Sequence, residues 1–295
     1  MTERQPALRM NHHFALSSGD PVFDVAMLRR SDFALRFTHG RNISVDERLI
    51  TKSFPLVPGL SRLVALAMIG GRMEVEGEGV LMPGDAMLLD VAALGRTRSQ
   101  DASDLRFEWD WEAPARPALP RRLGAPAMDQ VLTIADALQD RSSDQRTTIS
   151  SALDLFRSIG APLPLSLDAL EGEPTVQDHR LARAMEEQFE NVTNDTATTF
   201  HMGASMGLSE RQVRRLFEDF SKRYAINARS WRDAKNRWRV QNAVLLLSRS
   251  QLTVADVARE VGYASPNALA RAFSKVGFPP PAAIRQHMSE REPLF

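Results

Sequence analysis

The second half of the chain contains an internal repeat, and this repeat constrains the fold more than any other feature of the sequence. Residues 207–217 (GLSERQVRRLF) and 262–273 (GYASPNALARAF) each contain Gly, a bulky residue and then Ser. From each Ser, an apolar residue follows four positions later, Arg six positions later and Phe eight positions later. Two segments with the same order of residue types predict two copies of one structural unit.

Each copy has the residues that a helix, a tight turn and a second helix require. Gly207 and Gly262 suit the left-handed backbone conformation that ends a helix. Ser209 and Ser265 are expected to cap the next helix, and Pro266 suits its first turn. The sequence therefore predicts two helix-turn-helix units, a motif whose second helix enters the major groove of DNA.

A long basic helix is expected between the two units. Ten Lys and Arg residues lie between Arg211 and Arg239, and three acidic residues oppose them. Such a run is typical of a surface that binds phosphates, although a solvated helix face has the same composition. Trp231 and Trp238 lie seven residues apart and therefore share a face, where core packing is favoured over base stacking.

The formal net charge of zero conceals two halves of opposite sign. The chain has 37 basic and 37 acidic residues. Residues 1–175 contain 19 basic and 24 acidic residues, whereas residues 176–295 contain 18 and 13. The sign changes beside a Pro-rich stretch, so we expect a linker over 161–178 between an acidic half and a basic half.

The first half alternates short apolar runs with turn residues, a pattern typical of strands. Strands are expected over 25–37, 43–51, 63–69, 73–76, 86–90 and 107–111, with Gly70-Gly71 as a turn. Two helices are expected over 128–139 and 148–159, where apolar residues recur at helical spacing. Residues 1–20 are expected to be a flexible arm.

Further apolar and basic positions extend the repeat into a recognisable pattern. They are Arg214–Phe217, Arg239-Val240, Ala243, Leu246-Leu247, Val257-Ala258, Val261–Tyr263, Arg271–Phe273, Pro281 and Arg285. With these residues, the segment from about 180 to 287 resembles the DNA-binding domain of the AraC-type (AraC/XylS) transcription regulators. It departs from that pattern at Gly203, where Ala is usual, in a longer segment over 218–229, and at Gly277-Phe278, which reverses the usual order.

The resemblance implies an α+β chain of two domains. The first, over 21–160, is expected to be a cupin-like β-barrel or sandwich followed by a helical hairpin, because Pro83-Gly84-Asp85 resembles the turn of the family's effector-binding domain. The second, over 179–290, is expected to be all-α, with two helix-turn-helix units joined by a linker helix. The hairpin at 128–159 occupies the place of the family's dimerisation helices.

Seven residues are expected to contact DNA. In the family these positions lie on or next to the recognition helices; here they are Ser209, Arg211, Arg214, Arg215, Ser265, Asn267 and Arg271. Arg binds guanine or a phosphate, and Asn pairs with adenine. Arg215 is equally suited to a structural ion pair, and Asn267 to a plain role in the first helical turn.

The effector site is less well marked by the sequence. Arg36, His39 and Arg62 are candidates for an anionic ligand, and Trp109 and Trp111 could line the pocket, although core packing is the more common role of buried aromatics. A cupin-type enzyme is a weaker alternative, because the strand region has one His and the chain no Cys. No catalytic residue, metal or cofactor is therefore expected.

These observations predict a sequence-specific, DNA-binding transcription regulator, an activator by resemblance to the family, controlled by a small-molecule effector. Its expected partners are operator DNA, a second copy bound through 128–159, and RNA polymerase if it activates. The alternative is an effector-independent, architectural DNA-binding protein. No signal peptide or membrane-spanning run is evident, which favours a cytoplasmic, nucleoid-associated protein without membrane contact.

Overall fold

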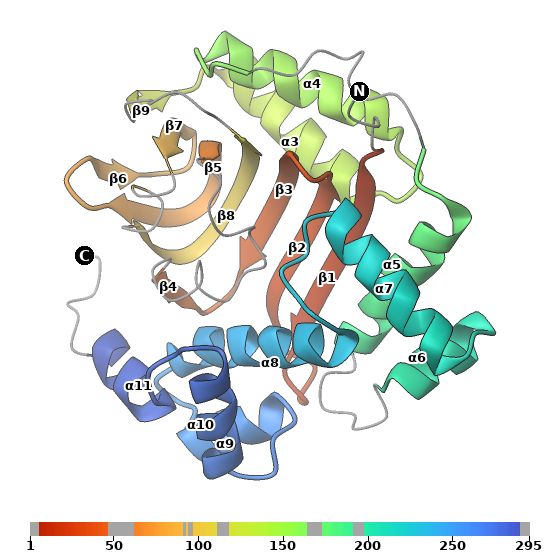
Figure 1. The fold of residues 1–295 in the computed structure, drawn as a ribbon. Coiled ribbons are helices and arrows are strands. Elements are labelled where there is room, and N and C mark those ends of the chain that lie inside the picture. Colours follow the sequence, from red (N-terminus) through yellow and green to blue (C-terminus); the bar gives the residue numbers. More distant parts are fainter. Residues whose placement is uncertain are drawn as a thin grey trace.

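The computed structural model describes residues 6–46, 62–90, 93, 97–110, 118–163, 173–190 and 198–289. Within these residues the N-terminal part forms one antiparallel sheet (Figure 1). Its nine strands are β1 (Leu8–Ala15), β2 (Pro21–Arg29), β3 (Phe33–Gly40), β4 (Ser44–Asp46), β5 (Arg62–Val75), β6 (Gly79–Leu81), β7 (Asp85–Asp90), β8 (Thr97–Asp110) and β9 (Ala118–Arg122). Their main order is β1-β2-β3-β8-β5-β7-β9.

Helices follow the sheet in two groups. The hairpin consists of α3 (Ala125–Gln139) and α4 (Gln145–Ser158). The second group is α5 (Val176–Glu190), α6 (Thr199–Met206), α7 (Glu210–Arg223), α8 (Trp231–Leu247), α9 (Val254–Glu260), α10 (Pro266–Lys275) and α11 (Pro281–Ser289). The expected α+β organisation of a sheet, a helical hairpin and a helical C-terminal part is confirmed.

The two longest strands, β5 and β8, bend together and fold the sheet back on itself. They pair along their whole length, with register shifts on either side of Gly70. Gly71 has φ +68°, and a Cβ there would lie 2.1 Å from the Asp101 carbonyl oxygen. The expected turn at Gly70-Gly71 is therefore wrong: the glycines form a bulge that lets one strand continue through the bend.

The sheet has two apolar faces because successive side chains alternate. Leu63, Ala65 and Ala67 of β5 face the hairpin helices, together with Phe107 and Trp109 of β8. Val64, Leu66 and Met68 point to the opposite side, where they pack inside the bend against Met73 and Leu81. The expected barrel or sandwich is thus realised as one bent sheet with a core on each side.

Two further expectations for the strands need correction. Residues 25–37 are not one strand but belong to β2 and β3, which turn at 30–32, where Arg30 pairs with Asp32 at 2.5 Å. The Arg30 amide also donates to the Phe33 carbonyl. Of the strand expected over 43–51, β4 covers 44–46, Ile43 precedes it, and 47–51 lie outside the described residues.

Residues 8–15 are not part of a flexible arm. They form β1, which pairs with β2 from Leu8↔Arg29 to Ala15↔Pro21. Leu8, Met10 and Phe14 alternate along the strand and are buried against the C-terminal helices. The alternation of apolar residues was visible in the sequence. The burial that such a strand requires comes from a distant segment, α5.

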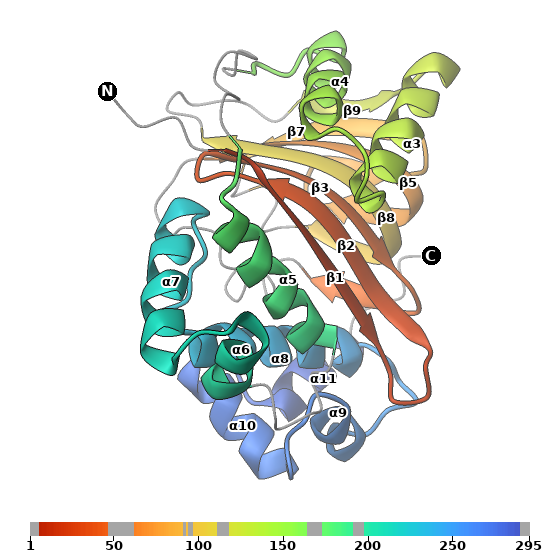
Figure 2. The ribbon, with the colours of Figure 1, turned by 90° about the vertical axis from the view of Figure 1, so that its right-hand side faces the viewer.

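The face of β1 and β2 that points away from the hairpin is covered by α5 and α8. Figure 2 shows the hairpin on one side of these strands and the C-terminal helices on the other. Phe189 of α5 lies 5.2 Å from the His12 ring and 5.0 Å from Trp238, measured between ring centroids. The two parts of the chain therefore share one hydrophobic core, which we call the shared core.

Truncation of Phe189 should test whether this shared core supports the whole fold. Phe189 is 6% exposed, so Phe189→Ala should lower the free energy of unfolding by about 3–5 kcal/mol. Phe200 on α6 is 63% exposed and provides the matched control, for which a change within about 0.5 kcal/mol is expected. Guanidinium titration of both variants measures the difference, and equal effects would contradict the described packing.

The buried position of His12 predicts a pH dependence of stability. Burial, aided by the positive charge of Arg29, lowers the His12 pKa from 6.5 to about 4, so the folded chain holds a neutral imidazole. Because the unfolded chain binds the proton first, this stabilisation is complete above pH 6.5 and is lost as the pH falls toward 4. From pH 7 to 5 the loss should be about 2 kcal/mol.

The substitution His12→Phe should remove that component and keep the ring packing. The free energy of unfolding is measured at pH 7 and at pH 5. Its decrease between these two values should be about 2 kcal/mol smaller in the variant than in the parent chain. An identical pH dependence in both proteins would show that His12 titrates normally in the folded state.

Candidate nucleic-acid interface

The first helix-turn-helix unit is built by α6 and α7 with a turn at 207–208. Gly207 has φ +66°, and the Leu208 amide donates to the Gly203 carbonyl at 2.8 Å. A Cβ on residue 203 would lie 2.5 Å from the Leu208 carbonyl oxygen. Gly203, which departs from the AraC-type pattern, is therefore explained by the close approach of the turn to α6.

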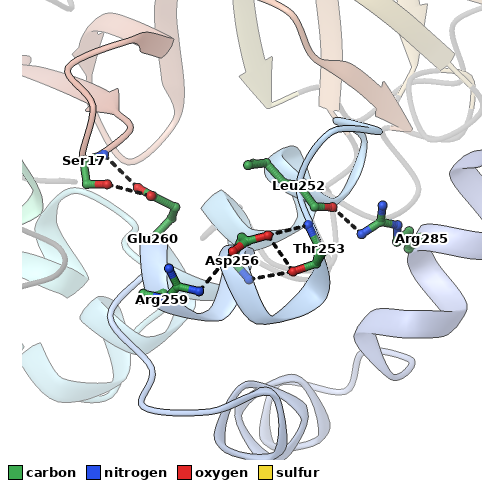
Figure 3. Close-up of polar contacts among 7 residues, drawn as sticks. All are labelled: Ser17, Leu252, Thr253, Asp256, Arg259, Glu260 and Arg285. Carbon is green, nitrogen blue, oxygen red and sulfur yellow. Dashed lines mark hydrogen bonds and ion pairs between the residues drawn. The ribbon is translucent and has the colours of Figure 1, made fainter.

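The second unit, α9 and α10, repeats this geometry. Gly262 has φ +78°, and the Tyr263 amide donates to the Ala258 carbonyl at 2.8 Å, five residues back as in the first unit. Figure 3 shows α9 capped by Thr253, whose hydroxyl and backbone amide both bond to Asp256. In the same view, Arg285 of α11 donates to the Leu252 carbonyl and closes the loop before α9.

Both recognition helices, α7 and α10, are fixed by the serines that the sequence predicts as caps. The Ser209 hydroxyl accepts from the Gln212 amide, and the Gln212 side chain accepts from the Ser209 amide at 2.9 Å, a complete capping box. The Ser265 hydroxyl accepts from the Ala268 amide at 3.2 Å. These caps orient the first turn of each helix.

The residues expected to contact DNA lie at the start of α7 and on α10. Arg211, Arg214 and Arg215 are exposed on α7, whereas Val213 and Phe217 point into the shared core. Arg214 forms an exposed pair with Glu210 at 3.1 Å, which a nucleic-acid contact could replace at little cost. Arg215 is exposed, and no carboxylate among the described residues forms an ion pair with it.

On the second recognition helix, Asn267 and Arg271 are exposed and Ser265 is partly buried. Leu269 and Phe273 are buried on the opposite face. The seven predicted residues thus occupy exposed or half-buried positions on two separate helices, in keeping with the repeat.

A buried carboxylate that the sequence analysis did not identify fixes the end of α7. Asp178 of α5 accepts two hydrogen bonds from the Arg223 guanidinium, at 2.8 and 2.6 Å, and a third from the Tyr224 hydroxyl at 3.2 Å. Burial beside this carboxylate raises the pKa of Tyr224. The 45-residue separation between Asp178 and Arg223 left no local sequence signal for this pair.

An open, basic groove of about 770 Å³ lies between the two units. Four cationic side chains and one carboxylate line it, namely Arg232, Lys235 and Arg239 of α8, Lys275 of α10, and Asp233 of α8. Asp233 accepts from the Arg229 amide and pairs with Arg237. The groove therefore carries a net positive potential despite this carboxylate.

The amino ends of two helices also line the groove. Thr198 and Thr199 at the start of α6 and Ser230 and Trp231 at the start of α8 belong to its lining. Helix amino ends present unpaired N–H groups and a partial positive charge, which favour phosphate. This surface, which we call the basic groove, therefore has the charge and the helix ends that suit a phosphate.

Trp231 and Trp238 of α8 behave as the sequence predicts for core residues. Trp231 is 3% and Trp238 7% exposed, and both rings lie against Phe189. The second unit is attached to the same helix, because the Tyr263 hydroxyl donates to Asn236 at 2.8 Å and Arg239 lies over the Tyr263 ring. Burial raises the Tyr263 pKa to about 12.

The structure does not bring the expected effector residues together. Arg36 pairs with Glu108 at 2.9 Å and lines a small cavity inside the bend. Trp109 faces the hairpin, on the other side of the sheet, and His39 contacts Ser103 and stacks on Phe37 of that same side. The Arg62 side chain and Trp111 lie outside the described residues.

Comparison with known proteins agrees with this geometry. Residues 202–287 match the family model described as a helix-turn-helix domain. Residues 202–287 form an AraC-type helix-turn-helix domain. The match extends from within α6 to within α11 and so includes both units. The C-terminal part of the chain is therefore a DNA-binding domain of the kind that transcription regulators carry.

Three solved structures are similar to the chain, and two of them are described as regulators. ToxT from Vibrio cholerae O395 is 7% identical, covers 97% of this chain and 99% of its own, and has a TM-score of 0.34. A DNA-binding transcriptional dual regulator from Escherichia coli K-12 is 14% identical, with coverages of 41% and 99% and a TM-score of 0.33. The AraC-like transcriptional activator CuxR is 14% identical, with coverages of 66% and 74% and a TM-score of 0.27.

No curated protein matches the sequence. Across the described ranges, no cluster of three or more His, Asp or Glu side chains is arranged to hold a metal ion. The helices of those ranges are each too short or too polar to cross a membrane.

Neutralising one cation of the basic groove should weaken DNA binding without changing sequence preference. If Arg232 meets a phosphate, Arg232→Gln should reduce the slope of log K against log salt concentration by about 0.9. Fluorescence anisotropy with two unrelated duplexes at four salt concentrations measures the slope. An unchanged slope on both duplexes would remove Arg232 from the interface.

Proposed function

We propose that the protein is a sequence-specific transcription regulator whose AraC-type domain binds operator DNA through α7 and α10. The observation that supports this most directly is the pair of structurally equivalent units, each with a serine-capped recognition helix, on either side of the basic groove. Two units of this kind reach successive major grooves, about 34 Å apart, on one face of a duplex. The proposed role is regulatory rather than catalytic.

The two recognition helices are proposed to contribute unequally. Arg211 and Arg214 on α7 reach base edges or the adjacent backbone, and Arg215 and Ser209 contact phosphates. On α10, Asn267 pairs with adenine, Arg271 with guanine or phosphate, and Ser265 lies near a phosphate. Because the first two turns of α10 otherwise present Pro266, Ala268 and Ala270, α7 supplies most of the direct readout.

The sheet and the hairpin are proposed to form the sensing part, over 21–160, preceded by β1 and joined through 161–178 to the domain over 179–290. A small-molecule effector bound on the sheet side would alter DNA affinity through the shared core, which joins the sheet to α5 and α8. The residues Arg36, His39, Arg62, Trp109 and Trp111 are not proposed as one pocket, because the described members lie on both sides of the sheet.

Further partners follow from the resemblance to AraC-type regulators. A second copy is proposed to pack against the α3–α4 hairpin, where Leu132 is an exposed large apolar side chain. The protein is proposed to activate transcription through contact with RNA polymerase. Its proposed compartment is the cytoplasm, where the chromosome lies. No cofactor enters this proposal.

Removal of one recognition side chain should test the proposed readout. Sites selected from a random DNA pool by the full chain provide the duplex. On that duplex Arg214→Ala should lose about 1–3 kcal/mol of binding free energy, because one base contact is removed. On a scrambled duplex the loss should be smaller, which separates base readout from charge.

The exposed Arg121 on β9 provides a matched control, since Arg121→Ala removes the same charge far along the chain from the AraC-type domain and outside the hairpin. This variant should bind the selected duplex like the parent chain. If Arg214→Ala and Arg121→Ala bind equally well, Arg214 does not read the operator.

A further inference from the structure

The carboxyl end of the first recognition helix, α7, is held by a side chain of the sheet. Arg29 of β2 donates through Nε to the Tyr224 carbonyl at 2.6 Å and through Nη2 to the Ala225 carbonyl at 2.5 Å. Tyr224 is the C-cap residue of α7, and Ala225 follows it. The last carbonyls of a helix lack partners within the helix and carry a partial negative charge, so a guanidinium is well suited to bind them.

Arg29 is buried, which distinguishes this contact from a surface pair. A buried guanidinium is costly unless its N–H groups are hydrogen-bonded. Two charge-assisted hydrogen bonds to consecutive carbonyls also fix a direction, since both must keep their geometry at once. The position of β2 and the end of α7 are therefore coupled.

The backbone at this end of α7 has a conformation that alanine rarely adopts. Ala225 has φ +49°. The Ile226 amide donates to the Ser221 carbonyl at 2.8 Å, and the Ala225 amide to the Lys222 carbonyl at 3.5 Å. These are the two bonds of a Schellman motif, in which Gly is usual at this position. Because a left-handed residue other than Gly persists only where its surroundings fix it, the bonds from Arg29 supply a constraint that the local sequence lacks.

A second anchor holds the same end of α7. Asp178 of α5 binds the side chains of Arg223 and Tyr224, as described above. The end of the helix is thus fixed by its backbone to the sheet and by its side chains to α5. The exposed Arg211 and Arg214 lie near the other end, where the operator is expected.

The length of α7 turns a small movement at the anchored end into a larger one at the amino end. Figures 1 and 2 show α7 running from α6 toward the sheet. It has 14 residues. At 1.5 Å per residue its length is about 21 Å, so a tilt of about 5° would move the amino end by about 2 Å. Hydrogen bonds to base edges tolerate less than this, because they weaken beyond a donor–acceptor distance of about 3.2 Å.

We propose that Arg29 is a positioning residue for the first recognition helix. It acts through α7: by holding the carboxyl end, it sets the angle at which the amino end meets base edges in one half of the operator. The inference rests on the proposed function, and it gives the sheet a part in sequence recognition.

The test compares two buried arginines that are neighbours in the chain. Arg29→Met removes the N–H donors and fills most of the same space. Arg30→Met is the matched control, because Arg30 is also buried and pairs with Asp32 within the β2–β3 turn. Thermal unfolding first identifies a temperature at which the parent chain and both variants are folded.

Binding is measured by anisotropy on three duplexes: the selected duplex and two forms of it, each with one half scrambled. The half read by α7 is the one whose scrambling removes the effect of Arg214→Ala. Arg29→Met should bind the selected duplex about tenfold more weakly than the parent chain, the cost of roughly one misaligned base contact. The same loss is expected when the half read by α10 is scrambled.

When the half read by α7 is scrambled, Arg29→Met and the parent chain should agree within about twofold, because the base contacts are then absent from both. The slope of log K against log salt concentration should not change, since a buried Arg29 meets no phosphate. Arg30→Met should bind all three duplexes like the parent chain. A variant that merely lost folded protein would instead bind all three duplexes more weakly.

The conservative variant Arg29→Lys provides a rescue. Lysine keeps the charge but lacks the fork of the guanidinium, so Arg29→Lys should bind the selected duplex only about threefold more weakly than the parent chain. If Arg29→Met does not fold, Arg29→Lys and Arg30→Lys carry the same comparison on the same three duplexes.

Hydrogen–deuterium exchange gives a readout that needs no DNA. The amides of residues 224–226 should exchange at least about tenfold faster in Arg29→Met, because the end of α7 opens more often, and at the parent rate in Arg30→Met. Unchanged exchange at these amides would overturn the inference.

Three binding results would also overturn it: equal losses on all three duplexes, no loss on the selected duplex, or the same loss in Arg30→Met. A parent chain that selects no duplex refutes the proposed function. The exchange experiment then still decides whether Arg29 fixes the end of α7.

Discussion

The packing of Phe189 against His12 and Trp238 joins three segments that are distant in the sequence, and the rest of the structure depends on it. Strands β1 and β2 bury one face under the hairpin and would expose the other to water without α5 and α8. In turn, α5 and α8 would expose Phe189 and two tryptophans without the strands. Because each side needs the other, the sheet and the AraC-type domain are coupled through apolar burial.

Polar contacts add directional constraints to this apolar core. Glu260 of α9 accepts from both the amide and the hydroxyl of Ser17 in the β1–β2 turn (Figure 3). Arg249, just after α8, donates to the carbonyls of Arg41 and Asn42. The first unit is fixed at its far end by Asp178 and Arg29. Both helix-turn-helix units are thus attached to the sheet, and any change in the sheet has a physical route to the recognition helices.

Local features of the fold were predictable from the sequence. Gly207 and Gly262 adopt the expected left-handed conformation, Ser209 and Ser265 cap the expected helices, and Trp238 is core. Each of these depends on a residue and its near neighbours. The repeat alone is therefore sufficient to predict the AraC-type domain.

Features that depend on distant partners were not predictable. The strand at 8–15 is buried against α5, a partner that the local sequence does not show, and a flexible arm was therefore expected there. The bulge requires Gly at position 71 because the Asp101 carbonyl of the neighbouring strand leaves no room for a Cβ. Arg36 and Trp109 were grouped by chemistry, but the two-residue period of their strands places them on opposite sides of the sheet.

The most direct measurement of the central claim is a footprint of the full chain on a duplex selected from a random or genomic pool. Two recognition helices in tandem predict two protected stretches on the same face of the DNA, about one helical turn apart. Hydroxyl-radical cleavage resolves such stretches. Protection of a single stretch, or uniform protection without a preferred sequence, would contradict the account.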